Sequence, residues 1–453
     1  MKTLNTVILS LLYLLFSNVC RADSPSGSWR GELVLGQVKL PLVFNFSEDG
    51  TGKISCTLDS PSQGAKGLPT EVETCTSDSI SLTCNLIGAS YHGKVETSVI
   101  KGTFNQRGYA FPLDLFPETP IEERRPQTPK PPYPYNVTDT TFTAPDGAVL
   151  SATLTMPAIA DKKNGKVPAI VMVTGSGAQN RDEEIFEHKP FAVIADYLAR
   201  NGIASLRYDD RGFGQSSGDL KQATTYTFKE DAASAIKLLR AIDGIGSVGV
   251  LGHSEGGTIA FMLAAESLPD FIVSLAGMTV SGKQTLLEQN SRVLDKMGLS
   301  ETEKENQLHI MELFFDTIAA QTKEGTILPI DVDSLVADSG LAADPRIVAS
   351  LKTTQNTRTP WIDAFIALKP EQFLKKIKCP VLAINGDKDT QVNANANLSV
   401  IKETIPEADI SLMPGLNHLM QHATTGEINE YGEIKETISP EVLDIITEFI
   451  KRF

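Results

Sequence analysis

The segment Gly252-His253-Ser254-Glu255-Gly256 decides how this chain folds. It follows an apolar run at 248–251 and precedes a helix-forming run at 257–263. A serine with glycines two positions away on either side is typical of a nucleophile elbow, in which a strand turns sharply into a helix and the hydroxyl projects from the sheet edge. The glycines let the strand and the helix approach closely. The motif therefore predicts an α/β sheet, with Ser254 as a nucleophile.

The residues after Ser254 supply an acid and a base in a fixed order. An apolar run at 379–385 predicts a buried parallel strand, and Asp387 and Asp389 follow it directly. A last short strand at 410–413 leads to His418. Groups that follow successive parallel strands meet at one edge of the sheet, in the chain order Ser, Asp, His. We therefore expect a catalytic triad of Ser254, Asp389 and His418.

Two alternatives stay open in these loops. His422 follows His418 by one helical turn, and a solvated histidine on a helix explains it more simply than a catalytic one. Asp387 lies on the same turn as Asp389, where it can act as a turn former whose side chain accepts hydrogen bonds from nearby backbone N–H groups.

A tetrahedral intermediate also needs hydrogen-bond donors for its oxyanion. The backbone N–H of Glu255, directly after the nucleophile, is one expected donor. The second is expected from the glycine-rich loop at 174–183, which follows an apolar strand at 169–173. We expect the N–H of Ser176 to serve there. In the loop at 209–218, we expect Asp210 and Arg211 to pair with each other and to have a structural role.

Taken together, these segments resemble the α/β-hydrolase superfamily, in particular the EstD-type bacterial carboxylesterases and the dienelactone-hydrolase-like enzymes. The resemblance rests on Gly175-Ser176-Gly177, 179–183, 210–214, the elbow, Gly386-x-x-Asp389 and His418. It covers about residues 136 to 453. It implies a serine esterase with no cofactor and no metal, and it favours Asp389, because the acid of these enzymes ends the Gly-x-x-Asp motif. The chain lacks a His-Gly-Gly-Gly oxyanion motif, which leaves the second donor open.

The N-terminal part of the chain has a different organisation. Residues 1–22 combine an early lysine, an apolar stretch at 7–16 and small residues near the end, which predicts a cleaved signal peptide and an exported protein. A lipoprotein anchored through Cys20 is the less favoured alternative. Turn residues and alternating apolar positions predict a small all-β domain at 23–117. A proline-rich linker is expected at 118–135.

Cysteine usage is compatible with export. Cys56, Cys75 and Cys84 lie close together in the all-β region, where a disulfide is permitted in an oxidising compartment. Their spacing resembles no zinc motif.

An interval at about 280–375 interrupts the alternation of strands and helices in the catalytic part. Its apolar positions recur with helical spacing, which predicts a helical insertion above the active-site face that acts as a lid. Its large apolar side chains are candidates for the wall of an acyl pocket, although packing among the helices explains each of them equally well: Met311, Phe314, Phe315, Trp361 and Phe365.

Charge narrows the set of partners. The chain has a formal net charge of −15, and removal of residues 1–22, which carry Lys2 and Arg21 and no acid, takes it to −17. Such acidity argues against nucleic acids and anionic membrane surfaces as partners. Beyond the N-terminal stretch, no run is long and apolar enough to span a membrane. The sequence does not indicate an oligomeric state.

These observations predict an exported serine hydrolase that cleaves small-molecule carboxylic esters through an acyl-enzyme. Two alternatives remain. A peptidase of the prolyl-oligopeptidase type would share the elbow, but the N-terminal region is too short for the β-propeller of that group. A binding protein on a hydrolase scaffold would lack catalysis, which an intact triad disfavours.

Overall fold

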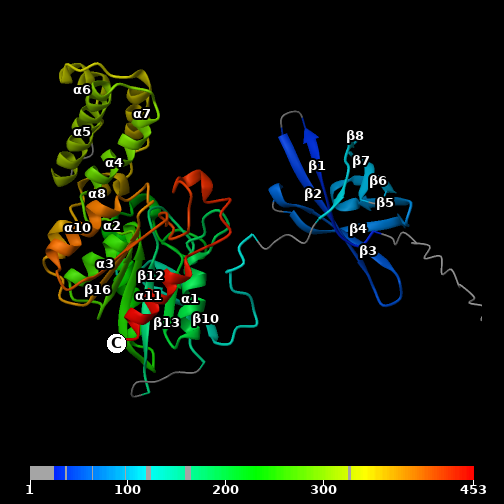
Figure 1. Cartoon of the computed structure of the whole chain (residues 1–453), viewed down its shortest axis with the longest axis horizontal. Coiled ribbons are helices and arrows are strands. Elements are labelled where there is room, and N and C mark those ends of the chain that lie inside the picture. Colours follow the sequence, from blue (N-terminus) through cyan, green and yellow to red (C-terminus); the bar gives the residue numbers. More distant parts are fainter. Residues whose placement is uncertain are drawn as a thin grey trace, which may run out of the picture. The chain divides into compact units, whose positions relative to one another are not determined.

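The computed structural model describes residues 25–35, 38–63, 65–96, 98–118, 124–158, 165–324 and 328–453. The chain divides into two compact units, Met1–Arg124 and Arg125–Phe453. In Figure 1 the first unit runs from blue to cyan and the second from cyan to red. The expected signal peptide, including Cys20, lies outside the described residues.

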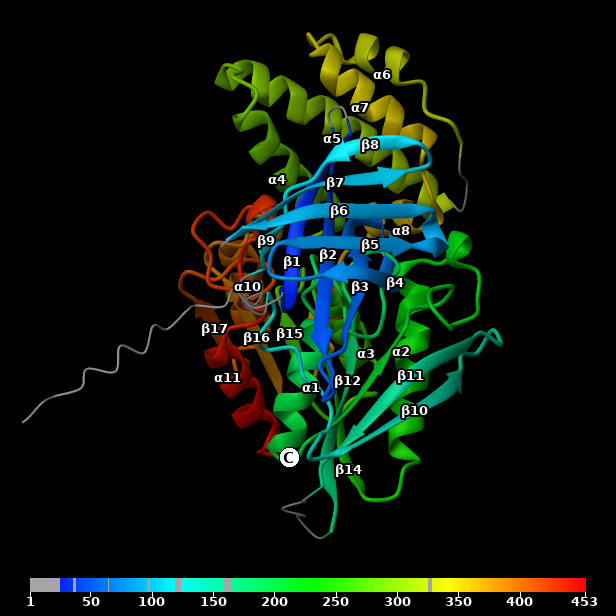
Figure 2. The same cartoon turned by 90° about the vertical axis from the view of Figure 1, so that its right-hand side faces the viewer.

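The first unit, called the β domain below, is a nine-stranded antiparallel sheet. Its strand order is β8-β7-β6-β5-β4-β3-β2-β1-β9. Figure 2 shows β1 to β3 crossing β5 to β8 at a steep angle. The strands are β1 (Gly27–Leu35), β2 (Val38–Glu48), β3 (Ile54–Ser60), β4 (Ala65–Cys75), β5 (Ser79–Cys84), β6 (Ala89–Glu96), β7 (Val99–Gln106), β8 (Tyr109–Pro112) and β9 (Phe116–Pro117).

Side chains that alternate between the two faces of these strands build the core of the β domain. On β2, Leu42, Phe44 and Phe46 point inward and are at most 4% exposed, as a side-chain period of two requires. The all-β character expected from the sequence is therefore present. Cys56 and Cys84 are buried in this core, and among the described residues they are not joined by a disulfide.

The second unit is built on a mixed eight-stranded sheet. Its strand order is β10-β11-β13-β12-β14-β15-β16-β17. The pairs β10–β11 and β11–β13 are antiparallel, and all later pairs are parallel. The strands are β10 (Asn136–Thr143), β11 (Val149–Met156), β12 (Val167–Val173), β13 (Ala204–Tyr208), β14 (Ile245–His253), β15 (Ile272–Leu275), β16 (Val381–Gly386) and β17 (Asp409–Met413).

Helices cover both faces of this sheet. Along β12, Val171 and Val173 belong to the core under one group of helices, whereas Ile170 and Met172 belong to the core under the other. A strand buried on both faces reads as a continuous apolar run, which is why 169–173 carries no polar residue. The first group contains α2 (Thr225–Arg240), α3 (Glu255–Ala265) and α10 (Ala394–Thr404), and the second contains α1 (Pro190–Arg200) and α11 (Pro440–Ile450).

A helical insertion separates β15 from β16, as expected, and Figure 1 shows most of its helices standing beyond one end of the sheet. It has an apolar core of its own that includes Met311 and Phe314, both at most 3% exposed. The helices are α4 (Gly282–Asp295), α5 (Glu301–Glu324), α6 (Val332–Ser339), α7 (Pro345–Asn356), α8 (Pro360–Ala367) and α9 (Glu371–Leu374).

Part of the proline-rich segment belongs to the second unit. The buried guanidinium of Arg125 donates hydrogen bonds to the carbonyls of Phe186, Gly432 and Ile434 at 2.7 to 3.1 Å. Gln127 accepts from Thr437 N and donates to the carbonyl of Ile438. The chain is therefore held against this unit from Arg125 onward, about ten residues before its first strand.

Candidate active site

The elbow has the strained geometry that the sequence predicts. Ser254 lies between β14 and α3 with φ 53° and ψ −118°, a region that residues other than glycine rarely adopt. A Cβ atom at Gly252 would lie 1.9 Å from the carbonyl oxygen of Gly256, and one at Gly256 would lie 2.1 Å from that of Val173. Only glycine fits at both positions, and the turn holds Ser254 at the C-terminal end of the sheet.

His418 and Asp389 are brought together by the loops after β17 and β16. His418 Nδ1 lies 2.7 Å from Asp389 Oδ2, and both side chains are at most 5% exposed. Asp389 Oδ1 accepts hydrogen bonds from the N–H groups of Gln391 and Val392, each at 2.8 Å. The carboxylate is thus fixed on one side by backbone donors and faces the imidazole on the other.

The two alternative residues, Asp387 and His422, have other partners. Asp387 accepts a hydrogen bond from Gly415 N at 2.7 Å, which is the turn-forming role considered for it. His422 pairs with Glu436 at 2.9 Å, and its side chain is 54% exposed. Among these four residues, the structure pairs His418 with Asp389.

A cavity of about 430 Å³ opens beside Ser254. Ser254, His418 and Ser176 all line it. Its other walls are mostly apolar and come from the insertion and from the loops around the sheet: Met278, Leu286, Phe315, Trp361, Ile362, Phe365, Ile366, Val392 and Leu419. Of the five insertion residues expected to line a pocket, Phe315, Trp361 and Phe365 do so, whereas Met311 and Phe314 pack inside the insertion.

Two backbone N–H groups near Ser254, those of Glu255 and Ser176, are the candidate oxyanion donors. Glu255 is the first residue of α3, so its N–H has no partner within the helix. In the loop after β12, Gly175 N already donates to Glu183 Oε1 at 2.7 Å. Ser176, the next residue, lines the cavity. This arrangement leaves Ser176 rather than Gly175 as the candidate donor from that loop.

The side chain of Glu255 is buried beneath the cavity. Thr225 Oγ1 donates to it at 2.6 Å, and the indole N–H of Trp361 donates to both carboxylate oxygens at 3.0 Å. Burial raises the pKa of Glu255, and the hydrogen bonds from Thr225, Trp361 and Ser176 act in the opposite direction. The residue after the nucleophile is thereby tied to helix α8 of the insertion.

A second buried pair, Glu183 and His253, contacts the backbone of the candidate triad, and no pattern in the sequence predicts it. His253 Nδ1 lies 2.9 Å from Glu183 Oε1, and His253 Nε2 lies 2.9 Å from the carbonyl oxygen of His418. Both ring nitrogens thus face acceptor oxygens, and this arrangement favours the protonated imidazole. Burial alone would lower the pKa of His253, but the charge and hydrogen bond of Glu183 outweigh it, and the pKa is raised above 6.5.

The expected pairing of Asp210 with Arg211 is wrong. Arg211 pairs instead with Asp231 at 2.5 Å and with Asp146 at 2.7 Å. Asp210 accepts hydrogen bonds from Thr174 Oγ1 and Gln179 N. Adjacent side chains on this loop point to different partners. Burial raises the pKa of Asp210 to about 8.

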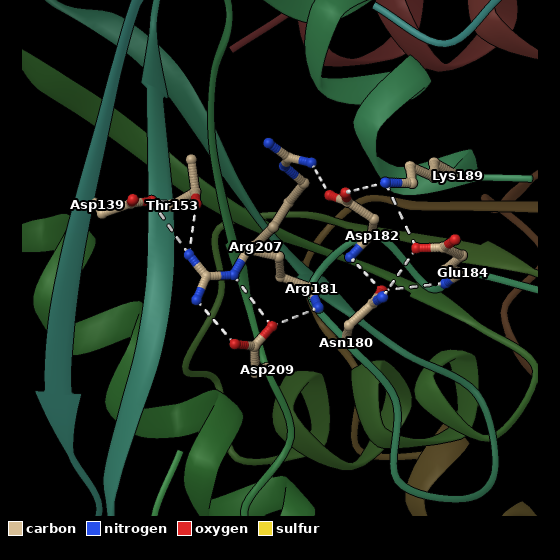
Figure 3. A network of polar contacts seen from close by, with 9 residues as sticks. All are labelled: Asp139, Thr153, Asn180, Arg181, Asp182, Glu184, Lys189, Arg207 and Asp209. Atoms are coloured by element: carbon tan, nitrogen blue, oxygen red, sulfur yellow. Dashed lines mark hydrogen bonds and ion pairs between the residues drawn. The ribbon is translucent and has the colours of Figure 1, made fainter. Parts of the chain in front are cut away.

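The loop that carries Ser176 and Glu183 is held by a polar network, which Figure 3 shows. Arg181 donates to Asp209 at 2.8 and 3.0 Å and to Thr153 at 2.6 Å. Asp182 pairs with Arg207 and, more weakly, with Lys189 at 4.0 Å. The loop between β12 and α1 is thereby fastened to β11 and β13.

Within the described residues, no group of three or more histidine, cysteine, aspartate or glutamate side chains could hold a metal ion. In the same part of the chain, no helix is both long and apolar enough to cross a membrane.

Comparison with known proteins places this site in a family. Residues 146–406 match the family described as X-Pro dipeptidyl-peptidase (S15 family). The chain belongs to this family. The S15 match includes the elbow, Asp389 and the helical insertion, and ends before His418.

The similar proteins include an esterase and a probable serine hydrolase. Esterase EstD of Thermotoga maritima is 28% identical over 261 residues, which are 57% of this chain and 56% of EstD. A probable serine hydrolase of Drosophila melanogaster is 26% identical over 190 residues, 38% of this chain and 55% of the relative. The chain therefore spans little more than half the length of these relatives. Together with the S15 family, they confirm the predicted relationship to the α/β-hydrolase serine esterases.

Solved structures also resemble the chain. The Pyrococcus furiosus esterase Pf2001 superposes with a TM-score of 0.43 and 16% identity, over 70% of this chain and 92% of that one. Est1E from Butyrivibrio proteoclasticus, solved with ferulic acid, gives a TM-score of 0.39 and 18% identity over 69% and 97%.

Proposed function

We propose that this protein is an exported serine hydrolase that cleaves carboxylic esters of small to medium acyl groups through an acyl-enzyme on Ser254. The observation that carries the proposal is the meeting of Ser254 and His418 on one apolar-walled cavity, with His418 bonded to the buried Asp389 at 2.7 Å. A nucleophile, a base and a group that orients the base are the parts that acyl transfer requires.

In the proposed reaction, His418 takes the proton of Ser254 as the hydroxyl attacks the ester carbonyl. Asp389 fixes the ring orientation through Nδ1 and stabilises the imidazolium that forms. The N–H groups of Glu255 and Ser176 bind the oxyanion. His418 then protonates the leaving alcohol, and water, activated by the same histidine, hydrolyses the acyl-enzyme.

The volume and the wall of the cavity favour a substrate with an uncharged acyl group. Its volume of about 430 Å³ is within the range of small-molecule sites, and most of its wall is apolar. Glu183 is the one carboxylate among the described residues that line it, and this carboxylate already accepts from Gly175 and faces His253. The helical insertion supplies much of the wall, and we propose that it acts as a lid that selects the acyl group.

A second candidate function is release of X-Pro dipeptides, which the name of the matched family suggests. A dipeptidyl peptidase must bind the free ammonium group of its substrate, and this needs an unpaired carboxylate near the cavity. The partners of Glu183 disfavour that role.

Parallel assays separate the two functions. Mature protein is tested on p-nitrophenyl esters of increasing acyl length and on Ala-Pro-p-nitroanilide, with Ser254→Ala as the control. We expect hydrolysis of the esters, lost in Ser254→Ala, and kcat/KM for the anilide at least about a hundredfold lower. Faster cleavage of the anilide would establish the peptidase instead.

Export is proposed from residues 1–22. Mass spectrometry of the protein isolated from cells is expected to find Asp23 as the first residue. A lipid-modified Cys20 at the N-terminus would show a lipoprotein.

A further inference from the structure

The β domain closes into a barrel. Beyond β8 the chain continues along β7, where Ile100 N and Leu115 N each donate to the other residue's carbonyl at 2.7 and 2.8 Å. The next residues, Phe116 and Pro117, pair with β1. One strand at 109–118 therefore contacts both β7 and β1, so that eight strands form a closed ring. A barrel of eight strands is either filled by its own side chains or holds one small ligand.

One end of this barrel is filled. Tyr91 is 1% exposed, and its ring lies 5.1 Å from that of Phe44. Its hydroxyl oxygen lies 3.1 and 3.0 Å from the carbonyl oxygens of Ile100 and Leu113, either of which can accept its proton. A Cβ atom at Gly102 would lie 2.3 Å from the Tyr91 hydroxyl. No room is left around this tyrosine.

The other end is hollow. A cavity of about 490 Å³ is lined by side chains of the inner faces of β1, β2, β3 and β7, among them Leu33, Leu42, Leu58 and Phe104, each at most 3% exposed. Protein interiors hold few voids larger than a water molecule. A space of this volume with apolar walls at a barrel mouth is where small-molecule sites occur.

The rim of the cavity combines apolar surface with one cation. Leu86 and Tyr109 line the cavity and are 69% and 70% exposed. Arg107, on the turn between β7 and β8, is the charged side chain among the described lining residues. The polar groups nearby are bonded within the domain: Ser60 Oγ donates to Gln63, and Gln106 Nε2 donates to the carbonyl of Ile87.

We propose that the β domain binds one aliphatic carboxylate, with its alkyl chain in the barrel cavity and its carboxylate beside Arg107. The apolar walls bury the chain, at about 0.8 kcal/mol for each methylene. The guanidinium matches the carboxylate in charge and geometry. This binding site is separate from the proposed hydrolase site and does not depend on its activity.

Calorimetry with decanoate, below its micellar concentration, tests the proposal. The protein is the full mature chain with Ser254→Ala, so that catalysis has no part in the result. We expect one site that Ala65→Trp, which fills the barrel cavity, weakens at least about tenfold. Leu286→Trp, which fills the cavity beside residue 254 instead, is the matched control and is expected to leave this binding unchanged.

Charge recognition is tested separately. Arg107→Gln is expected to weaken decanoate binding about five- to tenfold and to leave decanol binding unchanged. Because Ala65→Trp can disturb folding, Tyr109→Trp at the exposed rim provides a second measurement. In this variant 2-bromodecanoate, whose bromine lies next to the carboxylate, is expected to quench the added tryptophan beyond the quenching seen in the parent protein.

Three results would overturn the proposal. The first is no decanoate binding at millimolar concentration together with no added quenching in Tyr109→Trp. The second is binding that Leu286→Trp abolishes and that Ala65→Trp, shown to be folded by circular dichroism, leaves intact. The third is retention of the protein by phosphatidylglycerol vesicles without binding of monomeric decanoate, which would identify a membrane contact instead.

Discussion

Asp387 and Asp389 lie two residues apart on one turn, but their carboxylates have different partners. Asp389 faces His418, whereas Asp387 accepts from a backbone N–H. We expect Asp389→Asn to lower kcat about 10⁴-fold, because the amide no longer stabilises the imidazolium or selects the ring tautomer. Asp387→Asn is the matched control. A large loss in Asp387→Asn with Asp389→Asn near wild type would reverse the assignment.

Glu183 contacts two loops of the proposed active site. It accepts a hydrogen bond from Gly175 N and pairs with His253, whose ring also lies 2.9 Å from the His418 carbonyl oxygen. We therefore expect Glu183→Gln to lower kcat at least about tenfold with little change in KM. Glu184→Gln, at the neighbouring and more exposed position, is the control. An equal loss of kcat in both variants would show that Glu183 has no specific positioning role.

The same pair predicts a pH dependence of stability. The pKa of His253 is raised above 6.5 in the folded protein, so the stabilisation from its pairing with Glu183 is full below about pH 6.5 and is lost as the pH rises through the folded value. The difference in melting temperature between wild type and Glu183→Gln should shrink as the pH is raised from about 6.5 through the folded pKa of His253. A difference that is constant or grows with pH would contradict a charged His253.

The sequence predicted the residues whose position follows from strand order, and it missed those whose position depends on loop shape. Ser254, Asp389 and His418 each follow a strand, so their meeting could be expected, although their roles stay predictions. Glu183 and His253 are 70 residues apart in the chain, and no periodicity connects them. The wrong pairing of Asp210 with Arg211 arose because proximity in the chain does not fix side-chain direction on a loop.

At the scale of elements, helix α8 is joined to the elbow by the indole of Trp361. Its N–H lies 3.0 Å from both oxygens of the buried Glu255. Trp361→Phe should destabilise the protein by about 1 to 3 kcal/mol, because a buried carboxylate loses a donor, and should raise KM for the longer esters. Denaturant unfolding and ester kinetics measure these effects.

A double-mutant cycle supplies the control for this contact. In a Glu255→Gln background, Trp361→Phe is expected to cost less than in the wild type, because the two side chains interact directly. Additive effects would show that Trp361 contributes only by packing against its neighbours, such as Phe365.

The elements themselves were predicted where the pattern was long and regular. The buried strands of the second unit and the helical insertion follow from apolar runs and helical spacing. Closure of the β domain could not be predicted, because it depends on two short pairings made by the strand at 109–118. The attachment of Arg125 and Gln127 was also missed, since a proline-rich composition indicates an extended chain but not the surface that binds it.

At the scale of the whole molecule, the proposed catalytic residues all lie in the unit that begins at Arg125. A truncated protein starting at Arg124 should hydrolyse a short activated ester with kcat within about tenfold of the mature chain. One starting at Tyr135 lacks the hydrogen bonds of Arg125 and Gln127 and should melt at a lower temperature. A loss of about a hundredfold or more in folded, monodisperse protein starting at Arg124 would show that the β domain contributes to catalysis.

The central claim is that Ser254 is a nucleophile activated by His418 and Asp389. Intact-mass and peptide analysis after reaction with a fluorophosphonate tests it most directly. The account predicts one adduct, on the peptide that contains Ser254, absent in Ser254→Ala and formed at least about a hundredfold more slowly in His418→Ala. An adduct on another residue, or labelling of Ser254→Ala at the wild-type rate, would contradict it.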